Sequence, residues 1–237
     1  MQVAIFGASG GIGAALTTAL AARPEVEAIH AGARRPLPAT GKLRPFTFDY
    51  ADEASVARAC DDLAAHGPID MVLVATGRLT RADGTGPEKS VRAITAAGLA
   101  EQFAINAIGP ALVMRHAPSL LPRDRRAVFA ALSARVGSIG DNRLGGWHGY
   151  RAAKAALNML LRGLAIELAR SHPQAIAVGL HPGTVDTGLS APFHRGVAPE
   201  SLFTPQRSAD ALLSVLDGLV PAQSGHVFAW DGAEIPF

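Results

Sequence analysis

The chain has 237 residues, of which 49% are hydrophobic and 18% are charged. This length fits a single α/β domain with its own core, and the composition excludes a disordered chain. The formal net charge of +2, carried by scattered basic residues, argues against a nucleic-acid partner. Cys60 is the only cysteine, so no disulfide can form within the chain, and an inert core thiol is expected.

The subcellular location of the protein is predicted from features that the sequence lacks. No leader pattern of a basic segment followed by an apolar one is visible, and no apolar run approaches the ~20 residues that span a bilayer. Together with the single cysteine, these features predict a cytoplasmic protein in a reducing compartment. We expect neither a membrane partner nor a metal site.

Short apolar runs alternate with longer stretches of helical period, which predicts a parallel sheet with helical crossovers. Strands are predicted over Val3 to Phe6, Val26 to Ala33, Leu43 to Phe48, Met71 to Val74, Ala127 to Leu132, Ala175 to Leu180 and His226 to Trp230. Helices are predicted from Ile12 to Leu20, Asp52 to His66, Gly98 to Leu120, Tyr150 to Arg170 and Ser208 to Leu219. The expected fold class is α/β: a single-domain, doubly wound Rossmann fold over residues 1–237, with a mostly parallel seven-stranded sheet flanked by helices on both faces.

The turn after the first strand is rich in glycine and reads Gly7-Ala-Ser-Gly-Gly-Ile-Gly13. Glycines let the backbone approach a pyrophosphate closely, and the following helix offers free N–H groups to the anion. The predicted dinucleotide contacts are Gly7, Ser9, Gly11, Ile12 and Gly13. A purely structural turn is the alternative, but the position at the first strand-to-helix turn favours binding.

The turn after the second strand carries Arg34 and Arg35 and no carboxylate. Proteins that bind NAD place an acidic side chain there for the ribose 2′-hydroxyl, whereas a guanidinium can bind the 2′-phosphate of NADP. We therefore predict NADP(H) in preference to NAD(H), with Arg34 as the main contact. Arg35 has an equally simple interpretation as a solvated loop residue.

Tyr150 and Lys154 lie four residues apart at the start of a predicted helix, so their side chains share a face. With the glycine loop and with Ser133 directly after a strand, this Y-x-x-x-K pattern resembles the short-chain dehydrogenase/reductase family. The longer glycine-rich segment before the tyrosine resembles its C-factor-like and carbonyl-reductase-like branch. That segment also contains Ser138, a rival for the role of Ser133.

The resemblance implies an NADP(H)-dependent oxidoreductase that moves a hydride between nicotinamide and a small-molecule carbonyl or alcohol. Tyr150 would be the general acid and base. Lys154, together with the oxidised nicotinamide, would lower the pKa of Tyr150, and Lys154 would also hold the nicotinamide ribose. Ser133 would stabilise the substrate oxygen. Asn106 would hold a water that relays protons to Lys154.

Further cofactor contacts follow from the same resemblance. The loop from His181 to Thr187 resembles the Pro-Gly loop of the family, and its expected contacts are Pro182, Gly183, Val185 and Thr187. Asp49, after the third strand, would lie near the adenine, with a turn or helix-cap role as the alternative.

The sequence departs from the family pattern after the fourth strand. The usual N-N-A-G is replaced by Val74-Ala-Thr-Gly77, so both asparagines and their hydrogen bonds are lost. Backbone contacts from Ala75 and Gly77 are still expected.

The segment from Gly188 to Thr204 is expected to close over the nicotinamide with Phe193, Leu202 and Phe203. Trp147 and His148 would flank the pocket, although ordinary packing is the simpler interpretation of His148. Pro87 to Ser90 and Phe228 to Gly232 also resemble the C-factor-like branch, without a mechanism for either segment.

Two other functions compete with the oxidoreductase. An NADP(H)-binding signalling protein would need no turnover, and a sugar-nucleotide epimerase or dehydratase would need a longer substrate region and a different glycine spacing. The retention of Tyr150 and Lys154 favours the oxidoreductase. Pairing through the helices that carry Asn106 and Tyr150 would give a homodimer or homotetramer, which the sequence does not decide.

Overall fold

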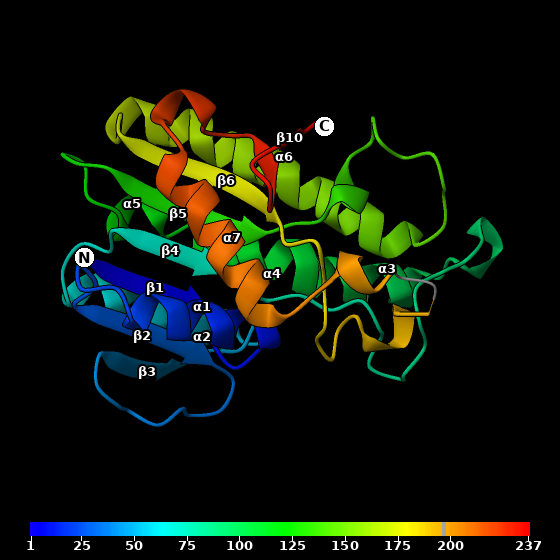
Figure 1. Cartoon of the computed structure of the whole chain (residues 1–237), viewed down its shortest axis with the longest axis horizontal. Coiled ribbons are helices and arrows are strands. Elements are labelled where there is room, and N and C mark those ends of the chain that lie inside the picture. Colours follow the sequence, from blue (N-terminus) through cyan, green and yellow to red (C-terminus); the bar gives the residue numbers. More distant parts are fainter. Residues whose placement is uncertain (196–197) are drawn as a thin grey trace.

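The computed structural model describes residues 1–195 and 198–237, and its central sheet lies between two layers of helices (Figure 1). Within these residues, eight strands form the sheet in the order β10-β9-β6-β5-β4-β1-β2-β3. Neighbouring strands are parallel, except that β10 runs antiparallel to β9. The strand order reverses beside β1, as in a doubly wound sheet. The predicted fold class is confirmed, with one strand more than the seven predicted.

The predicted strands agree with the observed ones to within two residues at every end. The sheet consists of β1 (Gln2–Phe6), β2 (Ala28–Ala33), β3 (Leu43–Thr47), β4 (Met71–Val74), β5 (Ala127–Leu132), β6 (Ala175–His181), β9 (Val227–Ala229) and β10 (Glu234–Ile235). A separate parallel pair is formed by β7 (Thr184–Val185) and β8 (Leu202–Phe203). The sequence analysis missed β7, β8 and β10, because two residues are too few for a recognisable apolar pattern.

Helices α1 (Gly11–Ala21) and α7 (Pro205–Gly218) cover one face of the sheet. The other face is covered by α2 (Glu53–Ala65), α4 (Gly109–Met114), α5 (Ala117–Leu120) and α6 (His148–Ser171). Both layers are visible in Figure 1, where α1 and α7 lie in front of the strands.

The core is divided by the sheet into two apolar clusters. Ile5 belongs to the cluster that contains Leu20 of α1, whereas its neighbour Phe6 belongs to the cluster that contains Leu157 of α6, because successive side chains of a strand point to opposite faces. Cys60 belongs to the α6 side, and burial raises the pKa of its thiol to about 12. The expectation of an inert core thiol is therefore confirmed.

The single helix predicted over residues 98–120 is wrong, because the chain is helical there in several pieces. α3 (Ala96–Phe103) continues through a π-helical turn, η2 (Ala104–Ile108), into α4, and α5 follows after a break. The backbone N–H of Gly109 bonds to the carbonyl of Ala104, five residues back. Pro110 has no N–H to give to the carbonyl four residues before it, so the regular ladder cannot continue through this turn.

By length and mean hydropathy alone, the helical stretch Ala96–Met114 could cross a membrane, since it has 19 residues and a mean hydropathy of 1.2. This corrects the expectation that no apolar run approaches that length. In the fold, 44% of the stretch is buried, and its three parts all pack against α6. A core helix passes the same test, so the expected absence of a membrane partner stays a prediction.

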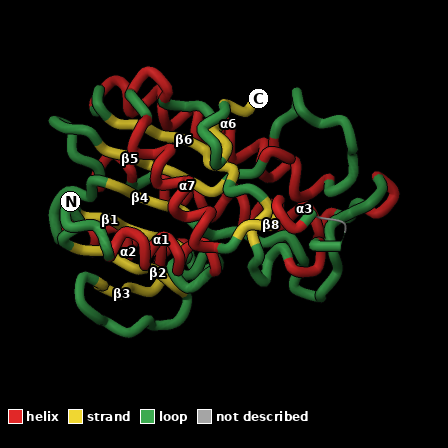
Figure 2. The backbone as a smooth tube through the Cα atoms, viewed as in Figure 1, coloured by secondary structure: helices red, strands yellow, loops and turns green. Residues whose placement is uncertain are grey.

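The longer connections gather at the carboxyl ends of the parallel strands, on the right in Figure 2. They contain the short helices η1 (Val91–Ala93), η3 (Arg135–Gly137), η4 (Ala191–Phe193) and η5 (Pro199–Ser201), whereas η6 (Pro221–Gln223) precedes β9. Ligands of doubly wound folds bind at this end of the sheet.

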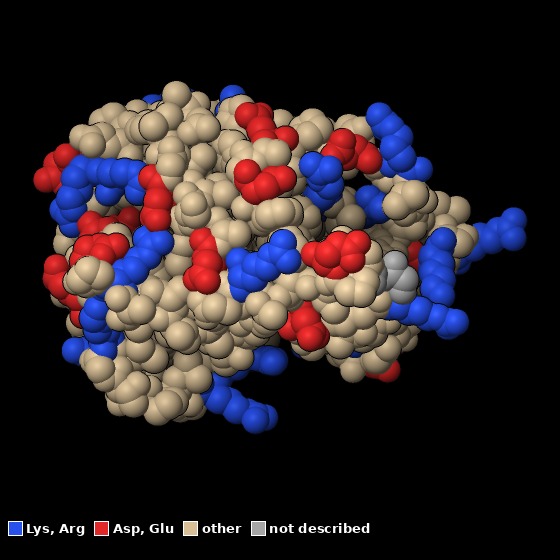
Figure 3. Space-filling model, viewed as in Figure 1, with Lys and Arg blue, Asp and Glu red and all other residues tan. Residues whose placement is uncertain are grey.

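The surface drawn in Figure 3 carries charged side chains of both signs, interspersed over the face. Ile108 of η2 and Met159 of α6 are apolar side chains that are 53% and 71% exposed. These are the helices through which pairing is expected, and the oligomeric state stays a prediction.

Two helical glycines provide a test of this packing. A Cβ added to Gly109 would overlap the Tyr50 ring, whereas a Cβ on Gly163 would have nothing within 4 Å. We expect Gly163→Ala to raise the free energy of unfolding by about 0.5–1 kcal/mol. Gly109→Ala should lower it by about 1–3 kcal/mol. Urea unfolding measures both, and the reverse order would contradict the packing of Tyr50 on α4.

Candidate active site

A cavity of about 520 Å³ opens at the carboxyl ends of the strands. It brings together the glycine loop, the ends of β4 and β5, the start of α6 and the loop after β6. The predicted site residues that line it are Gly11, Ile12, Ala75, Gly77, Ser133, Tyr150, Lys154, Pro182, Gly183, Val185 and Thr187. Residues from five separate parts of the sequence thus meet in one place.

The glycine loop is held by contacts that side chains would prevent. Gly7 has a φ of 98°, which favours glycine, and its N–H donates to the carbonyl of Gly32 at 2.9 Å. A Cβ on Gly13 would overlap the carbonyl of Gly7. Ser9 is exposed beside the first turn of α1, and Gly10, the N-cap, gives the helix no side-chain cap.

The glycine loop meets the loop after β6. A Cβ on Gly11 would lie 2.6 Å from Cγ2 of Thr187, so only glycine leaves room for Thr187 at this contact. Gly183 has a φ of 79° and packs against the rings of Phe203 and Trp230. Residues of the two predicted cofactor loops are thereby brought into contact.

Six predicted nucleotide contacts are not among the described residues that line the cavity. Gly7, Ser9 and Gly13 belong to the glycine loop beside it, and Arg34, Arg35 and Asp49 follow β2 and β3. Arg34 and Arg35 are exposed after β2, where their guanidinium groups are open to solvent. Asp49 is also exposed, and its carboxylate accepts a hydrogen bond from the N–H of Ala51 at 3.0 Å. Asp49 therefore has the turn role, and a contact to adenine stays a prediction.

Tyr150 and Lys154 are buried side by side in the first turns of α6, 8% and 2% exposed. The Lys154 Nζ lies 5.7 Å from the centre of the Tyr150 ring and donates to the carbonyl of Leu132 at 2.7 Å. Burial lowers the pKa of Lys154 to about 7 and raises the pKa of Tyr150. Desolvation therefore pushes both side chains toward their neutral forms, opposite to the lowering expected for Tyr150.

The two candidate serines have different surroundings. Ser133 lines the cavity, and its hydroxyl donates to Oδ1 of Asn158 at 2.6 Å. Ser138 is buried, and its hydroxyl accepts a hydrogen bond from the N–H of Asp141 at 3.0 Å. Ser138 is not one of the described residues that line the cavity. The geometry therefore favours Ser133.

Asn106 lies in η2 and is fully buried. Its Oδ1 accepts from the N–H of Arg78 at 3.1 Å, and its Nδ2 donates to the carbonyl of Arg78 at 2.8 Å and to Gln102. A Cβ on Gly77 would lie 3.3 Å from the Asn106 Oδ1 and 3.8 Å from the Lys154 Nζ. The Asn106 Oδ1 and the Lys154 Nζ therefore both lie beside Gly77, and the expected water between them stays a prediction.

The predicted lid is partly wrong. Phe193 lines the cavity and contacts Trp147, with 5.4 Å between ring centres. Phe203 instead packs edge-on against Trp230 at 4.7 Å, and among the described residues neither it nor Leu202 lines the cavity. Leu202 and Phe203 form β8, and the pairing of β8 with β7 holds both residues away from the cavity. Positions 196 and 197 of the predicted lid lie outside the described residues.

Of the two residues predicted to flank the pocket, one lines the cavity and one does not. Trp147 lines the cavity, with its ring centre 6.5 Å from that of Tyr150, whereas His148 is not among the described lining residues. His181 also lines the cavity, and burial with the nearby Arg135 charge lowers the pKa of its imidazole to about 4. His181 is therefore neutral near pH 7.

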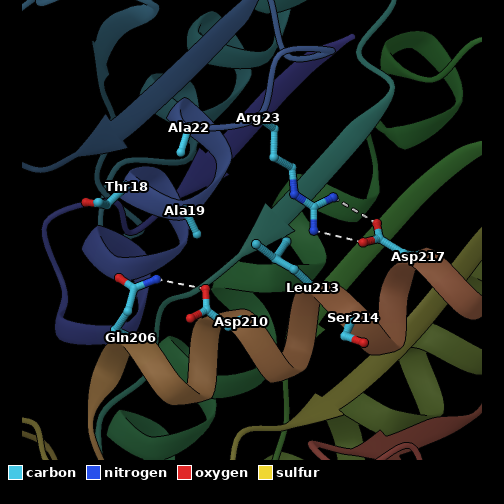
Figure 4. A pocket seen from close by; sticks show the side chains of 9 residues that line it. All are labelled: Thr18, Ala19, Ala22, Arg23, Gln206, Asp210, Leu213, Ser214 and Asp217. Carbon is cyan, nitrogen blue, oxygen red and sulfur yellow. Dashed lines mark hydrogen bonds and ion pairs between the residues drawn. The ribbon is translucent and has the colours of Figure 1, made fainter.

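A second cavity of about 400 Å³ lies between α1 and α7 (Figure 4). The Arg23 guanidinium is paired there with both carboxylate oxygens of Asp217 at 2.9 and 2.8 Å, and Gln206 donates to Asp210. The charges of Arg23 and Asp217 neutralise each other, and none of the predicted site residues lines this cavity. The cavity at the carboxyl ends of the strands is therefore the candidate active site.

Comparison with known families identifies the family to which this chain belongs. The family model described as short chain dehydrogenase matches residues 1–197. The chain belongs to the short-chain dehydrogenase family. It is 33% identical over 175 residues to C-signal of Myxococcus xanthus, a match that covers 72% of this chain and 94% of that protein.

Solved structures of carbonyl reductases have the same fold as this short-chain dehydrogenase. A carbonyl reductase from Pseudomonas aeruginosa PAO1 superposes with a TM-score of 0.80 at 26% identity, covering 100% of this chain and 99% of that one. The NADPH-bound carbonyl reductase from chicken fatty liver has a TM-score of 0.85 at 23% identity, with coverages of 100% and 94%.

The sequence analysis of this short-chain dehydrogenase missed the role of Glu88, which is 6% exposed. Its carboxylate accepts from the N–H of Gly149 at 3.1 Å, and its carbonyl accepts from the N–H of Trp147. A carboxylate at a helix N-terminus is favoured by the free N–H groups and the helix dipole. Glu88 thus caps the helix that carries Tyr150, which gives a mechanism to the segment Pro87 to Ser90.

Asn158 was also missed, although the sequence contains a signal for it. It follows Lys154 by four residues, so it continues the helix face that carries Tyr150 and Lys154. It is 3% exposed and bonds to Ser133.

Burial of Lys154 predicts how stability varies with pH. An unfolded lysine has a pKa of ~10.4, so between pH 7 and about 10 the unfolded chain holds a proton that the folded chain has lost. Stability of the native protein should therefore rise with pH across this window, by at most about 1.4 kcal/mol per pH unit relative to Lys154→Met. Below pH 7 the folded and the unfolded chain both hold the Lys154 proton, so the destabilisation caused by burying the charged amine is present in full there. Urea unfolding at pH 7, 8 and 9 measures the difference.

The matched control is Lys89→Met, because Lys89 is exposed and its removal should leave the pH dependence of the native protein unchanged. Parallel pH dependences of the native protein and Lys154→Met would show that Lys154 remains protonated in the folded state.

Proposed function

We propose that this short-chain dehydrogenase is an NADP(H)-dependent oxidoreductase that reduces a carbonyl or oxidises the corresponding alcohol. The observation that carries the proposal is the buried row of Tyr150 and Lys154 in a cavity that also receives Ser133 and the glycine loop. A proton donor, a hydroxyl and a phosphate-binding turn are the groups that this reaction needs.

The residues present fit a dinucleotide. The first turn of α1 has no side-chain cap, so its N–H groups are available to a pyrophosphate. The tight packing of Gly13 on Gly7 and of Gly11 on Thr187 requires positions without side chains, which lets the backbone of the turn approach a pyrophosphate closely. Arg34 would meet the 2′-phosphate of NADP, and the loop from Pro182 to Thr187 would hold the nicotinamide end. The bound cofactor would supply or accept the hydride.

The protein would supply the proton. Because burial raises the pKa of Tyr150, the phenol is protonated near pH 7 and is ready to donate to a carbonyl oxygen as hydride reaches the carbon. The Lys154 pKa of about 7 suits a group that returns a proton at neutral pH. In the oxidation direction, a positive nicotinamide ring in the cavity would oppose the desolvation of Tyr150 and favour the phenolate.

The wall around the proposed reacting groups favours a substrate with apolar substituents. It is formed by Leu79, Val136, Trp147, Leu189 and Phe193. These side chains would exclude water from the carbonyl and bury an aromatic or aliphatic group beside it. The similarity to a carbonyl reductase from Pseudomonas aeruginosa supports a carbonyl compound as the substrate.

The relative named C-signal raises the second candidate, an NADP(H)-binding signalling protein without turnover. Burial of Lys154 beside Tyr150 favours the enzyme, because binding alone does not need an ammonium group desolvated at this cost.

Replacement of the proposed acid tests the function. We expect Tyr150→Phe to lower kcat by about 10²–10⁴-fold, with NADPH affinity unchanged. Oxidation of NADPH is followed with 4-nitrobenzaldehyde, acetophenone and an ortho-quinone. Tyr50→Phe is the matched control, since Tyr50 bonds to Thr76 and does not line the cavity among the described residues. NADPH binding without turnover of any carbonyl by the native chain would favour the signalling protein.

Cofactor preference is tested at the turn after β2. A charge-assisted hydrogen bond contributes about 1.5–3 kcal/mol, so Arg34→Ala should weaken NADPH binding by about 10- to 100-fold and leave NADH binding unchanged. Fluorescence titration of both nucleotides measures this. Arg35→Ala is the control and should have a smaller effect. Equal affinity of the native chain for NADH and NADPH would contradict the assignment.

A further inference from the structure

The Ser133 hydroxyl makes a hydrogen bond that its proposed task does not explain. Its Oγ lies 2.6 Å from Oδ1 of Asn158, and both residues are 3% exposed. A serine hydroxyl has one proton. While that proton is donated to Asn158, none is available for a carbonyl oxygen in the cavity.

Asn158 is placed by the helix that also places the proposed acid. It follows Lys154 by four residues and Tyr150 by eight, so the three side chains form one row along α6. Tyr150 and Lys154 line the cavity, whereas Asn158 is not among the described lining residues. Asn158 therefore reaches the cavity through the Ser133 hydroxyl.

An amide side chain can reverse the direction of this hydrogen bond. A half-turn of the Asn158 amide puts Nδ2 where Oδ1 lies, with almost no change of shape. Nδ2 then donates to Ser133 Oγ, and the hydroxyl proton is free to point into the cavity. Without the half-turn, a Ser133 hydroxyl that points at the substrate would leave two oxygen acceptors facing each other at close range, which is unfavourable.

We propose that Asn158 is a positioning residue whose amide N–H donates to Ser133 Oγ during turnover, so that the Ser133 hydroxyl donates to the substrate oxygen. The inference rests on the proposed function. A hydroxyl whose oxygen accepts a hydrogen bond is also a stronger donor, because linked hydrogen bonds polarise one another.

Two substitutions separate this role from simple packing. The carboxylate of Asn158→Asp has nearly the same shape as the amide but can only accept, so it keeps the Ser133 proton. Asn158→Leu removes donor and acceptor and leaves the hydroxyl free to turn. We expect kcat to fall by about a hundredfold in Asn158→Asp and by less in Asn158→Leu, with KM and NADPH affinity nearly unchanged. A packing role predicts the reverse order.

The pH profile is a second readout. A protonated carboxyl can donate to Ser133, so kcat of Asn158→Asp should rise as the pH falls, whereas Asn158→Leu should follow the native profile. The other titratable groups of α6 are His148, Tyr150, Arg151, Lys154, Arg162, Glu167 and Arg170, and the adjoining elements add Arg135 of η3 and His181 of β6. They are the same in both variants, so the comparison isolates the new carboxyl. If Asn158→Leu fails to fold, the profile of Asn158→Asp against the native protein still decides.

A double-mutant cycle tests whether Asn158 acts through Ser133. In a Ser133→Ala background, Asn158→Asp should lower kcat by less than about twofold further. Native kcat in Asn158→Asp, or an equal loss in both backgrounds, would overturn the role of Asn158 while leaving the proposed function intact. A native chain that turns over no carbonyl of the panel would overturn the proposed function and this role together.

Discussion

Burial of the Lys154 ammonium group beside the Tyr150 phenol is the constraint on which the rest of the cavity depends. The carbonyl of Leu132 accepts a hydrogen bond from Nζ at 2.7 Å, which offsets part of the cost of desolvation. That carbonyl belongs to the last residue of β5, and Ser133 follows it. One hydrogen bond therefore fixes the end of β5 against the start of α6, and places the hydroxyl, the phenol and the amine around the same space.

Much of the fold could be predicted from the sequence because strands buried on both faces are continuous apolar runs. Met71 to Val74 and Ala127 to Leu132 match β4 and β5 at both ends. The helix over residues 98–120 was wrong because apolar periodicity does not report the loss of a backbone donor at Pro110, or the π-turn before it. The edge strand β10 has two residues, and it depends on pairing with β9, which no local pattern indicates.

The candidate site was predicted where spacing along one element places the residues, as with Tyr150 and Lys154 on α6. Asn158 lies on the same row and could have been found by extending the spacing one more turn. Glu88 could not, because its partner Gly149 is 61 residues away in the sequence, and a buried carboxylate cap has no local signature when it comes from another segment. Phe203 was assigned to the lid because an aromatic residue in a loop is ambiguous until its strand partner is known.

The cap supplied by Glu88 also accounts for the strained turn before α6. Gly145, Gly146 and Trp147 have φ values of 65°, 64° and 51°, and the left-handed conformation costs a non-glycine residue about 1–2 kcal/mol. Glu88 accepts hydrogen bonds from the N–H groups of Trp147 and Gly149, which would otherwise be unpaired at the helix start. A Cβ on Gly149 would lie 3.0 Å from the Glu88 carboxylate, so a side chain at this position would push the carboxylate away from the N–H. A contact from Glu88, outside the turn, therefore stabilises the strained conformation of Trp147. Trp147 lies one residue before α6 and three before Tyr150, and this conformation places its indole in the cavity wall.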